Sequence, residues 1–326
     1  MIDRRPPWSE TLHGELVPLI DYLDSRLIGK HTVMTYLVTA LLAGGHILLD
    51  DVPGVGKTTL AKALADALDL RYHRIQCTPD LLPSDITGMT IFNPATRQFE
   101  FHPGPLFSHL IIADEINRTS PRTQSALLEV MQERQVTVDG VSRPVPNPFM
   151  LIATENPLEF EGTYPLPESQ LDRFLFRLSL GYPTPEEELA LLTDREDPAA
   201  LSTPVLTTDR LLALQEAVRQ VVVAPAVKRY LVDIVQATRI HPAVRLGLSP
   251  RATLALYHAS QAWAFLHDRP FVTPDDIQDL APYVALHRMV VDDKAWGSPT
   301  SSSRQEIFQE ILRRIPVPTV PEGRSL

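Results

Sequence analysis

The sequence is poor in several features that mark specialised classes of protein. Cys77 is the single cysteine in 326 residues, so no disulfide forms within the chain and a reducing compartment is expected. The longest largely apolar stretch, residues 37–49, is too short to cross a bilayer. The N-terminal residues carry arginines and prolines without a following apolar segment, so they lack the pattern of a signal peptide. These absences predict a soluble, cytoplasmic protein that does not insert into membranes.

Basic residues and glycine are also scarce. The chain has 30 lysines and arginines against 40 acidic residues, and its formal net charge of -10 disfavours a broad nucleic-acid-binding surface. It has 14 glycines and 30 prolines, whereas proteins on average contain about 7% glycine and 5% proline. With 44% hydrophobic residues, a chain of this length can build the cores of about two domains.

Hydrophobic periodicity divides the chain into two parts. Strands are expected at residues 46–49, 71–77, 110–113, 150–154 and 174–180, and helices at 12–27, 31–43, 60–68 and 122–132. This alternation predicts an α/β domain with a largely parallel sheet over residues 1–185. Only helical patterns follow, so an all-helical domain is expected over residues 186–316, and a flexible proline-containing tail over 317–326.

A glycine-containing loop between a strand and a helix gives the strongest chemical signal. Gly54 and Gly56 allow successive backbone N–H groups to face an anion, Lys57 brings a positive charge to phosphates, and Thr58 offers a hydroxyl to Mg²⁺. The strict phosphate-loop pattern has glycine at position 51, where this chain has aspartate. An ordinary strand–turn–helix connection is the alternative. The predicted nucleotide-binding residues are Pro53, Gly54, Val55, Gly56, Lys57, Thr58 and Thr59.

Two acidic residues follow the apolar strand at residues 110–113. Parallel α/β sheets bind ligands at the edge where such strands end, so Asp114 and Glu115 are expected near the phosphate loop. Asp114 is predicted to bind Mg²⁺ together with Thr58, and Glu115 to polarise the water that attacks the γ-phosphate of ATP. The alternative is a strand that ends in solvated acids.

Several segments resemble the MoxR group of AAA+ ATPases. They are DVPGVGKT at 51–58, QCTPDLLPSDITG at 76–88, HPGPLF at 102–107, DEINR at 114–118, IATENP at 152–157 and LPESQLDRF at 166–174. The resemblance runs from about residue 28 to residue 288. It implies a P-loop AAA+ domain with insertion loops and a small helical lid, which binds ATP and Mg²⁺ between neighbouring subunits of a ring, usually of six.

The resemblance also implies roles for residues outside the loop and the acidic pair. Asn156 matches sensor 1, which positions the attacking water, although an Asn-Pro turn would explain it equally simply. Gln76 matches a position that can hold Glu115 away from its water. Arg251 matches sensor 2, which contacts the γ-phosphate; the alternative is a solvated arginine in the first turn of a helix.

Arg173 matches the arginine finger that reaches into the neighbour's site and stabilises charge on the transferring phosphoryl group. The alternative is an ion pair with Asp172 or Glu168. Arg118 and Arg122 are the other candidates for a finger.

Two insertions distinguish this group. The first spans residues 88–105, and the second, residues 133–149, is predicted to be a hairpin because Asp139-Gly140 separates two β-prone segments. In the family such loops point towards the pore of the ring and contact substrate. A surface hairpin without a contact role is the alternative.

Three classes of function follow. The first is an ATPase that remodels or matures a protein client. The resemblance implies work with von Willebrand factor A partners and in metal-cofactor insertion. The sequence lacks the Asp-x-Ser-x-Ser segment that such partners carry, so the partner would be another polypeptide. The second is a motor on nucleic acid. The hairpin contains Arg134 and Arg143, but also two acids and one aromatic residue, so this class is not favoured. The third is an ATP-dependent switch or a small-molecule kinase.

Overall fold

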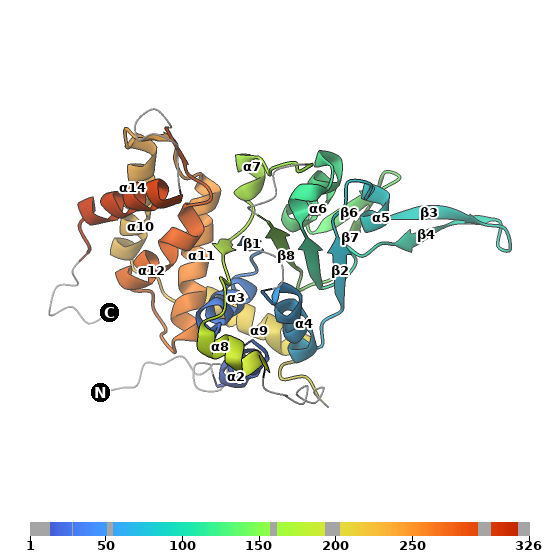
Figure 1. Ribbon diagram of the computed structural model, residues 1–326, viewed down its shortest axis with the longest axis horizontal. Coiled ribbons are helices and arrows are strands. Elements are labelled where there is room, and N and C mark those ends of the chain that lie inside the picture. The colour runs from blue at the N-terminus through green and yellow to red at the C-terminus, as the bar shows by residue number, and fades with distance from the viewer. Residues whose placement is uncertain are drawn as a thin grey trace. The chain divides into compact units, whose positions relative to one another are not determined.

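The computed structural model describes residues 14–27, 29–50, 55–156, 162–192, 203–292 and 301–318 (Figure 1). The described residues form two compact units that divide after Gln215. The expected boundary at residue 185 falls within the first unit, because later residues bond to that unit. Lys30 Nζ lies 3.4 Å from Glu187 Oε2, and Gln215 Nε2 donates to the Leu41 carbonyl at 2.7 Å.

The first unit is built on a five-stranded sheet in which all paired strands are parallel. The strands, in spatial order, are β2 (Tyr72–Gln76), β5 (Leu110–Asp114), β8 (Met150–Glu155), β1 (Ile47–Asp50) and β9 (Phe176–Leu178). They occupy the five segments where strands are expected from the sequence, so the predicted α/β class is confirmed. Their carboxyl ends meet at one edge of the sheet.

Helices pack on both faces of this sheet, with α4 (Lys57–Leu68) against β5 on one face and α6 (Pro121–Glu133) on the other. The other helices that begin in this unit are α2 (Leu16–Arg26), α3 (His31–Leu42), α5 (Pro83–Thr87), α7 (Glu168–Leu171), α8 (Pro185–Leu192) and α9 (Thr208–Arg219), the last of which runs across the division after Gln215. Leu127, Leu128 and Met131 of α6 share a buried cluster with Ile111 and Ala113 of β5. Because side chains alternate along a strand, Ile112 and Asp114 point to the opposite face of the sheet. Helix α4 packs against β5 on that face.

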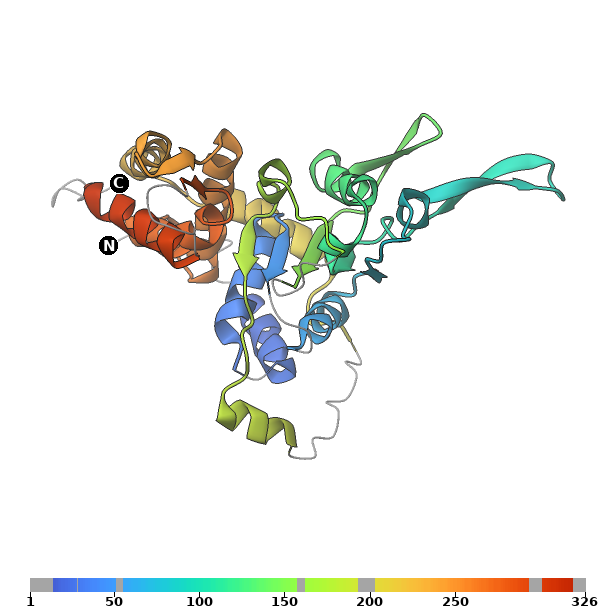
Figure 2. The same cartoon turned by 45° about the horizontal axis from the view of Figure 1, so that its top comes forward.

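Both predicted insertions are antiparallel hairpins (Figure 2). The first hairpin pairs β3 (Gly88–Asn93) with β4 (Gln98–Pro103), directly after the short helix α5. The second pairs β6 (Gln135–Val138) with β7 (Val141–Pro144). Its turn contains Asp139 and Gly140, whose φ angles of 53° and 75° are those expected of this turn sequence.

The second unit is mainly helical. Its helices include α10 (Pro225–Ile240), α11 (Pro250–Leu266), α12 (Pro274–Ala285) and α14 (Ser301–Arg314). The expectation of an exclusively helical domain is wrong in one detail, since β10 (Val244–Leu246) and β11 (Val290–Val291) form an antiparallel ribbon. Strands this short are below the length at which an alternating pattern can be recognised. Among the described helices, none is both long and apolar enough to span a membrane.

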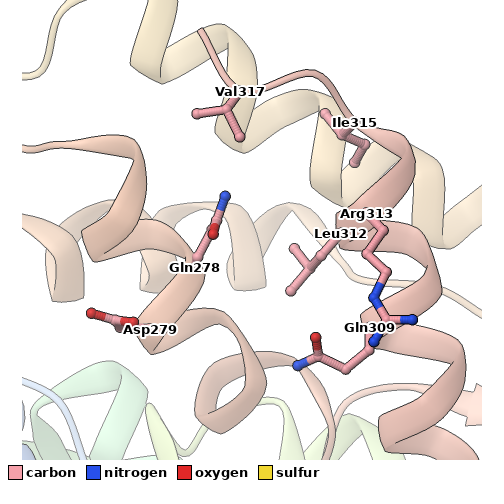
Figure 3. Close-up of a pocket in the computed structure, with 7 residues that line it drawn as sticks. All are labelled: Gln278, Asp279, Gln309, Leu312, Arg313, Ile315 and Val317. Atoms are coloured by element: carbon pink, nitrogen blue, oxygen red, sulfur yellow. The ribbon is translucent and has the colours of Figure 1, made fainter. Parts of the chain in front are cut away.

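A pocket of about 380 Å³ lies between α12 and the C-terminal part of the second unit (Figure 3). Gln278 and Asp279 of α12 face it from one side, and Leu312 and Arg313 of α14 from the other. Partial desolvation, together with nearby Asp276 and Asp275, raises the pKa of the Asp279 carboxyl. None of the residues that line this pocket belongs to the acidic pair or the phosphate loop.

His46 is a buried titratable group in the core of the first unit. Its Nδ1 accepts a hydrogen bond from the Leu151 amide at 3.0 Å, and its Nε2 lies 3.3 Å from the Met131 carbonyl. The ring is therefore neutral, with its proton on Nε2. Burial lowers the pKa of His46 to about 3, and the nearby Arg134 guanidinium contributes in the same direction.

We predict an acid-sensitive contribution to stability from this residue. The pKa is lower in the folded than in the unfolded chain, so this contribution is complete above pH 6.5 and is lost as the pH falls towards 3. Between pH 7 and pH 5 the loss is expected to be about 2 kcal/mol. Urea unfolding of the His46→Asn variant should show a correspondingly smaller pH effect than the wild type. The exposed His102→Asn control should retain the full effect, and equal slopes in all three proteins would contradict the assignment.

Candidate nucleotide site

The helix α4 begins directly after a glycine in a left-handed conformation. Gly56 precedes its first residue with φ of 96°, in the left-handed region, and its carbonyl accepts the Leu60 amide at 3.0 Å. Lys57 and Thr58 lie in the first turn of α4, where the helix dipole favours an anion, and both are half-buried. Val55 precedes them and Thr59 is exposed. The predicted residues Pro53 and Gly54 lie outside the described residues.

The acidic pair lies at the carboxyl edge of the sheet. Asp114 ends the fully buried strand β5, and its Cα pairs in register with Gln76 of β2. Glu115 follows with φ of 55°, a left-handed conformation that is uncommon for a residue other than glycine. It begins the 3₁₀ turn η1 (Ile116–Arg118), and this turn directs its side chain back over the end of β2.

Two donors bind the same oxygen of Glu115. Gln76 Nε2 donates to Oε2 at 3.1 Å, and Arg118 Nη1 donates to it at 3.2 Å. The family resemblance offers Gln76 as a residue that can hold Glu115, with a plain strand-end glutamine as the alternative, whereas Arg118 is only a candidate finger. In this arrangement Glu115 is restrained by a neutral amide and by a guanidinium three residues along the chain.

Asp114 has its own partners. Arg74 of β2 donates from Nε to Asp114 Oδ2 at 2.6 Å. Thr154 of β8 lies on the other side, with Oγ1 3.5 Å from Asp114 Oδ1, and the same hydroxyl accepts the Glu115 amide at 2.9 Å. The carboxylate of Asp114 is therefore held by β2, and the backbone of Glu115 by β8.

A second charged cluster lies at the same sheet edge, directly before the phosphate loop. Asp50 ends β1 and pairs in register with Glu155 of β8. Arg177 of β9 donates from Nη2 to Asp50 Oδ2 at 2.6 Å. Burial raises the pKa of the Glu155 carboxyl, Arg177 partly offsets this, and Asp50 adds to it. The loop thus begins from a strand end that is held by an ion pair.

The remaining predicted residues occupy three different places. Asn156 is buried and lies directly after β8, which is the neighbour of β5 in the sheet. Arg173 follows α7 and donates from Nη1 to the Leu128 carbonyl of α6 at 2.5 Å, so its contact lies within the chain. Arg122 is exposed in the first turn of α6. Arg251 lies in the first turn of α11 in the second unit, after Ser249, which accepts the Ala252 amide and caps the helix.

The oxygen donors present fit Mg²⁺. The Thr58 hydroxyl and an Asp114 carboxylate oxygen are hard ligands, and Mg²⁺ typically takes one or two such protein ligands together with phosphate oxygens and waters. Among the described residues there is no cluster of three or more histidine, cysteine, aspartate or glutamate side chains that could hold a metal by itself. The donor set is thus suited to a metal that arrives with a nucleotide.

Sequence reasoning missed two residues that contact the acidic pair. Arg74 precedes Gln76 by two positions, so both side chains point to the same face of β2. That period-two relation is the signal that could have identified Arg74. Thr154 stands two residues before Asn156 at the end of a strand, and only the pairing of β8 with β5 reveals that it touches Asp114 and Glu115.

Comparisons with known proteins find family matches in both units. Residues 46–176 match the family described as "ATPase family associated with various cellular activities (AAA)", and residues 236–311 match the AAA lid domain. The first match contains Lys57, the acidic pair, Asn156 and Arg173, and the second contains Arg251.

Individual relatives extend over nearly the whole chain. A Bacillus subtilis protein, YeaC, is 48% identical over 95% of this chain and 97% of its own length. Chaperone MoxR1 of Mycobacterium tuberculosis is 38% identical over 90% of this chain and 80% of its own length. A crystal structure of a Cytophaga hutchinsonii protein superposes with a TM-score of 0.87 at 35% identity, and covers 95% of this chain and 97% of its own.

A buried amide supports the turn that carries Glu115. Gln124 of α6 is 1% exposed, and its Nε2 donates to the carbonyls of Ile116, Thr119 and Tyr164 at 3.1, 3.3 and 2.8 Å. It thereby joins η1 to the segment before α7.

The Gln124→Leu substitution should therefore destabilise the first unit by about 2 kcal/mol, because buried carbonyls would lose their donor. Urea unfolding measures this change. Glu129→Leu, on the exposed side of the same helix, is the matched control and should change stability by less than about 0.5 kcal/mol. A Gln124 variant as stable as that control would exclude the supporting role.

Proposed function

Because the chain belongs to the MoxR group of AAA ATPases, we propose that it hydrolyses ATP in a ring of subunits, most simply a hexamer, to remodel or mature a protein client. The observation that carries the proposal is the restrained acidic pair at the sheet edge beside the first turn of α4. ATP and Mg²⁺ are the cofactors that these groups suit.

Each residue of the site has a proposed task. Residues 53–59 would cradle the phosphates, with Lys57 neutralising the terminal ones. Thr58 and Asp114 would hold Mg²⁺ with the phosphate oxygens, and that ion supplies charge neutralisation when bound. Glu115 would accept a proton from the attacking water, and Asn156 would orient that water.

The contacts of Glu115 suggest how hydrolysis is controlled. While Gln76 and Arg118 donate to Oε2, that oxygen is engaged and is not available to an attacking water. Hydrolysis then requires the side chain to rotate away from these donors. Since Gln76 lies at the end of an edge strand, a displacement of β2 by a bound client could release Glu115.

Arginines from other places would complete the site. We propose Arg173 as the finger that acts on the neighbouring subunit's nucleotide, and Arg251 as the lid residue that contacts the γ-phosphate. The bond from Arg173 to the Leu128 carbonyl implies that the guanidinium must leave α6 to reach a neighbour. Arg118 is less suited to that task, because its guanidinium binds Glu115.

The second hairpin argues against nucleic acid as the client. Arg134 donates to the carbonyls of Phe149 and Gly44, and Arg143 lies over the Phe101 ring at 4.0 Å. Both arginines of the hairpin are thus engaged in contacts within the chain, where they hold hairpins and sheet together. Tracking a phosphate backbone requires exposed cations, so this part of the molecule offers little affinity for DNA or RNA.

The first hairpin exposes apolar rather than basic side chains. Phe99 is 74% exposed and packs edge-to-face against Phe92, while Met89 and Ile91 are exposed on the opposite face. Apolar surface of this kind fits a polypeptide with hydrophobic side chains. The proposal includes a von Willebrand factor A partner and a role in metal-cofactor insertion, as the family resemblance implies. Both would involve another polypeptide.

A nucleotide-dependent switch without turnover is the second candidate function.

Glu115→Gln should lower the rate of ATP hydrolysis by about 100-fold or more, because the base is lost, while ATP binding is retained. Steady-state phosphate release and fluorescent-nucleotide binding measure the two effects. Glu129→Gln is the matched control and should leave both unchanged. Equal rates for wild type and Glu115→Gln would remove Glu115 from its role, and binding without phosphate release in the wild type would favour the switch.

Mixing experiments test the finger. Arg173→Ala and Lys57→Ala subunits should each be inactive alone, whereas an equal mixture should recover about a quarter of the wild-type rate, since half the sites are intact and half of those gain an intact neighbour. Phosphate release after subunit exchange is the measurement. An active Arg173→Ala ring, or a mixture with no recovery, would show that Arg173 does not act across an interface.

A further inference from the structure

A guanidinium lies against the carboxylate that is proposed to bind Mg²⁺. Arg74 Nε is 2.6 Å from Asp114 Oδ2, and the two side chains differ sharply in exposure, at 49% for Arg74 and 9% for Asp114. Within the described part of the chain, this is the hydrogen bond by which Arg74 is held. The arginine therefore has a path to solvent, whereas the aspartate does not.

The position of Arg74 on the sheet is set by strand pairing. Every second residue of β2 points to the same face of the sheet as Asp114, namely Tyr72, Arg74 and Gln76. Helix α4 packs against β5 on this face. Burial raises the pKa of the Tyr72 phenol, Arg74 lowers it, and Asp114 and Asp66 of α4 raise it, so these groups share one electrostatic environment. Arg74 thus lies on the side of the sheet from which Thr58 of α4 would approach the metal.

Two cations would share Asp114 when Mg²⁺ binds. One carboxylate oxygen is engaged by Arg74, and the other is 3.5 Å from the Thr154 hydroxyl, too far for a strong hydrogen bond. A divalent ion at the second oxygen would lie within several ångströms of the guanidinium. At a separation of about 6 Å and the dielectric constant of water, their repulsion alone corresponds to about a tenfold loss of Mg²⁺ affinity.

We propose that Arg74 is a resident counter-charge on Asp114 that weakens Mg²⁺ binding by this chain and so makes metal loading depend on the phosphates that accompany the ion. The guanidinium neutralises a nearly buried carboxylate, which would otherwise be costly to keep charged. Arg74 is a positioning residue and not a catalytic one, because it acts through Asp114. This inference rests on the proposed function of the site.

The test measures how much a Mg²⁺ ion already bound to ADP adds to the affinity of ADP for the protein. The affinity for fluorescent ADP is determined in EDTA and at a Mg²⁺ concentration that saturates ADP but not the nucleotide-free protein, and the ratio isolates the effect of the metal. In Arg74→Gln this ratio should rise about five- to tenfold, since the repulsion is removed. Arg74→Lys keeps the charge and should stay close to the wild type.

Matched controls separate this effect from general changes. Arg71→Gln removes a positive charge directly before β2, about 10 Å along the chain from Arg74, and should not alter the ratio. Asp114→Asn should abolish the Mg²⁺ effect, and thermal melting verifies that each variant is folded. An unchanged or lower ratio in Arg74→Gln overturns the inference while ADP binding and hydrolysis stand. Absence of nucleotide binding in the wild type would instead overturn the proposed function.

Discussion

The carboxylates at the end of β5 impose the constraint on which the rest of the site depends. β5 is buried along its whole length, so Asp114 carries a negative charge at the end of an apolar strand. A charge in that position needs donors, and among the described residues the two flanking strands and the following turn provide them. β2 supplies Arg74 and Gln76, β8 supplies Thr154, and η1 supplies Arg118. Parallel pairing makes this convergence unavoidable, because all strand ends lie at one edge.

Helix α6 connects this edge to other parts of the first unit. Gln124 near its beginning binds the turn of Glu115, the Leu128 carbonyl in its middle accepts Arg173, and the Met131 carbonyl near its end contacts buried His46. One helix thus contacts the turn that follows Glu115, the proposed finger Arg173 and His46, which lies directly before β1. A movement of Arg173 towards a neighbouring subunit would break a contact on the same helix that supports Glu115. This gives a physical route by which the state of one interface could influence hydrolysis within the chain.

The sequence predicted the elements better than the contacts between them. All five strands and the hairpin at Asp139-Gly140 were foreseen, because hydrophobic periodicity and turn residues are local signals. The contacts of Arg74, Thr154 and Gln124 depend on which strands and turns become neighbours, and one sequence does not specify that order. The predicted pairing of Gln76 with Glu115 came from family resemblance, and the structure supplies its geometry. The ribbon of β10 and β11 was missed because strands of two or three residues carry no readable pattern.

The second hairpin contacts the base of the first, whereas the far end of the first hairpin is exposed. Arg143 of the second hairpin lies over Phe101 of the first, and Phe101 in turn packs edge-to-face against Phe107, so the base of the first hairpin is fixed by ring contacts. Its far end instead leaves Phe92 and Phe99 exposed. Exposed aromatic rings carry a solvation cost that a purely structural hairpin would avoid. A fixed base and an apolar end are properties that suit the proposed contact with a polypeptide client.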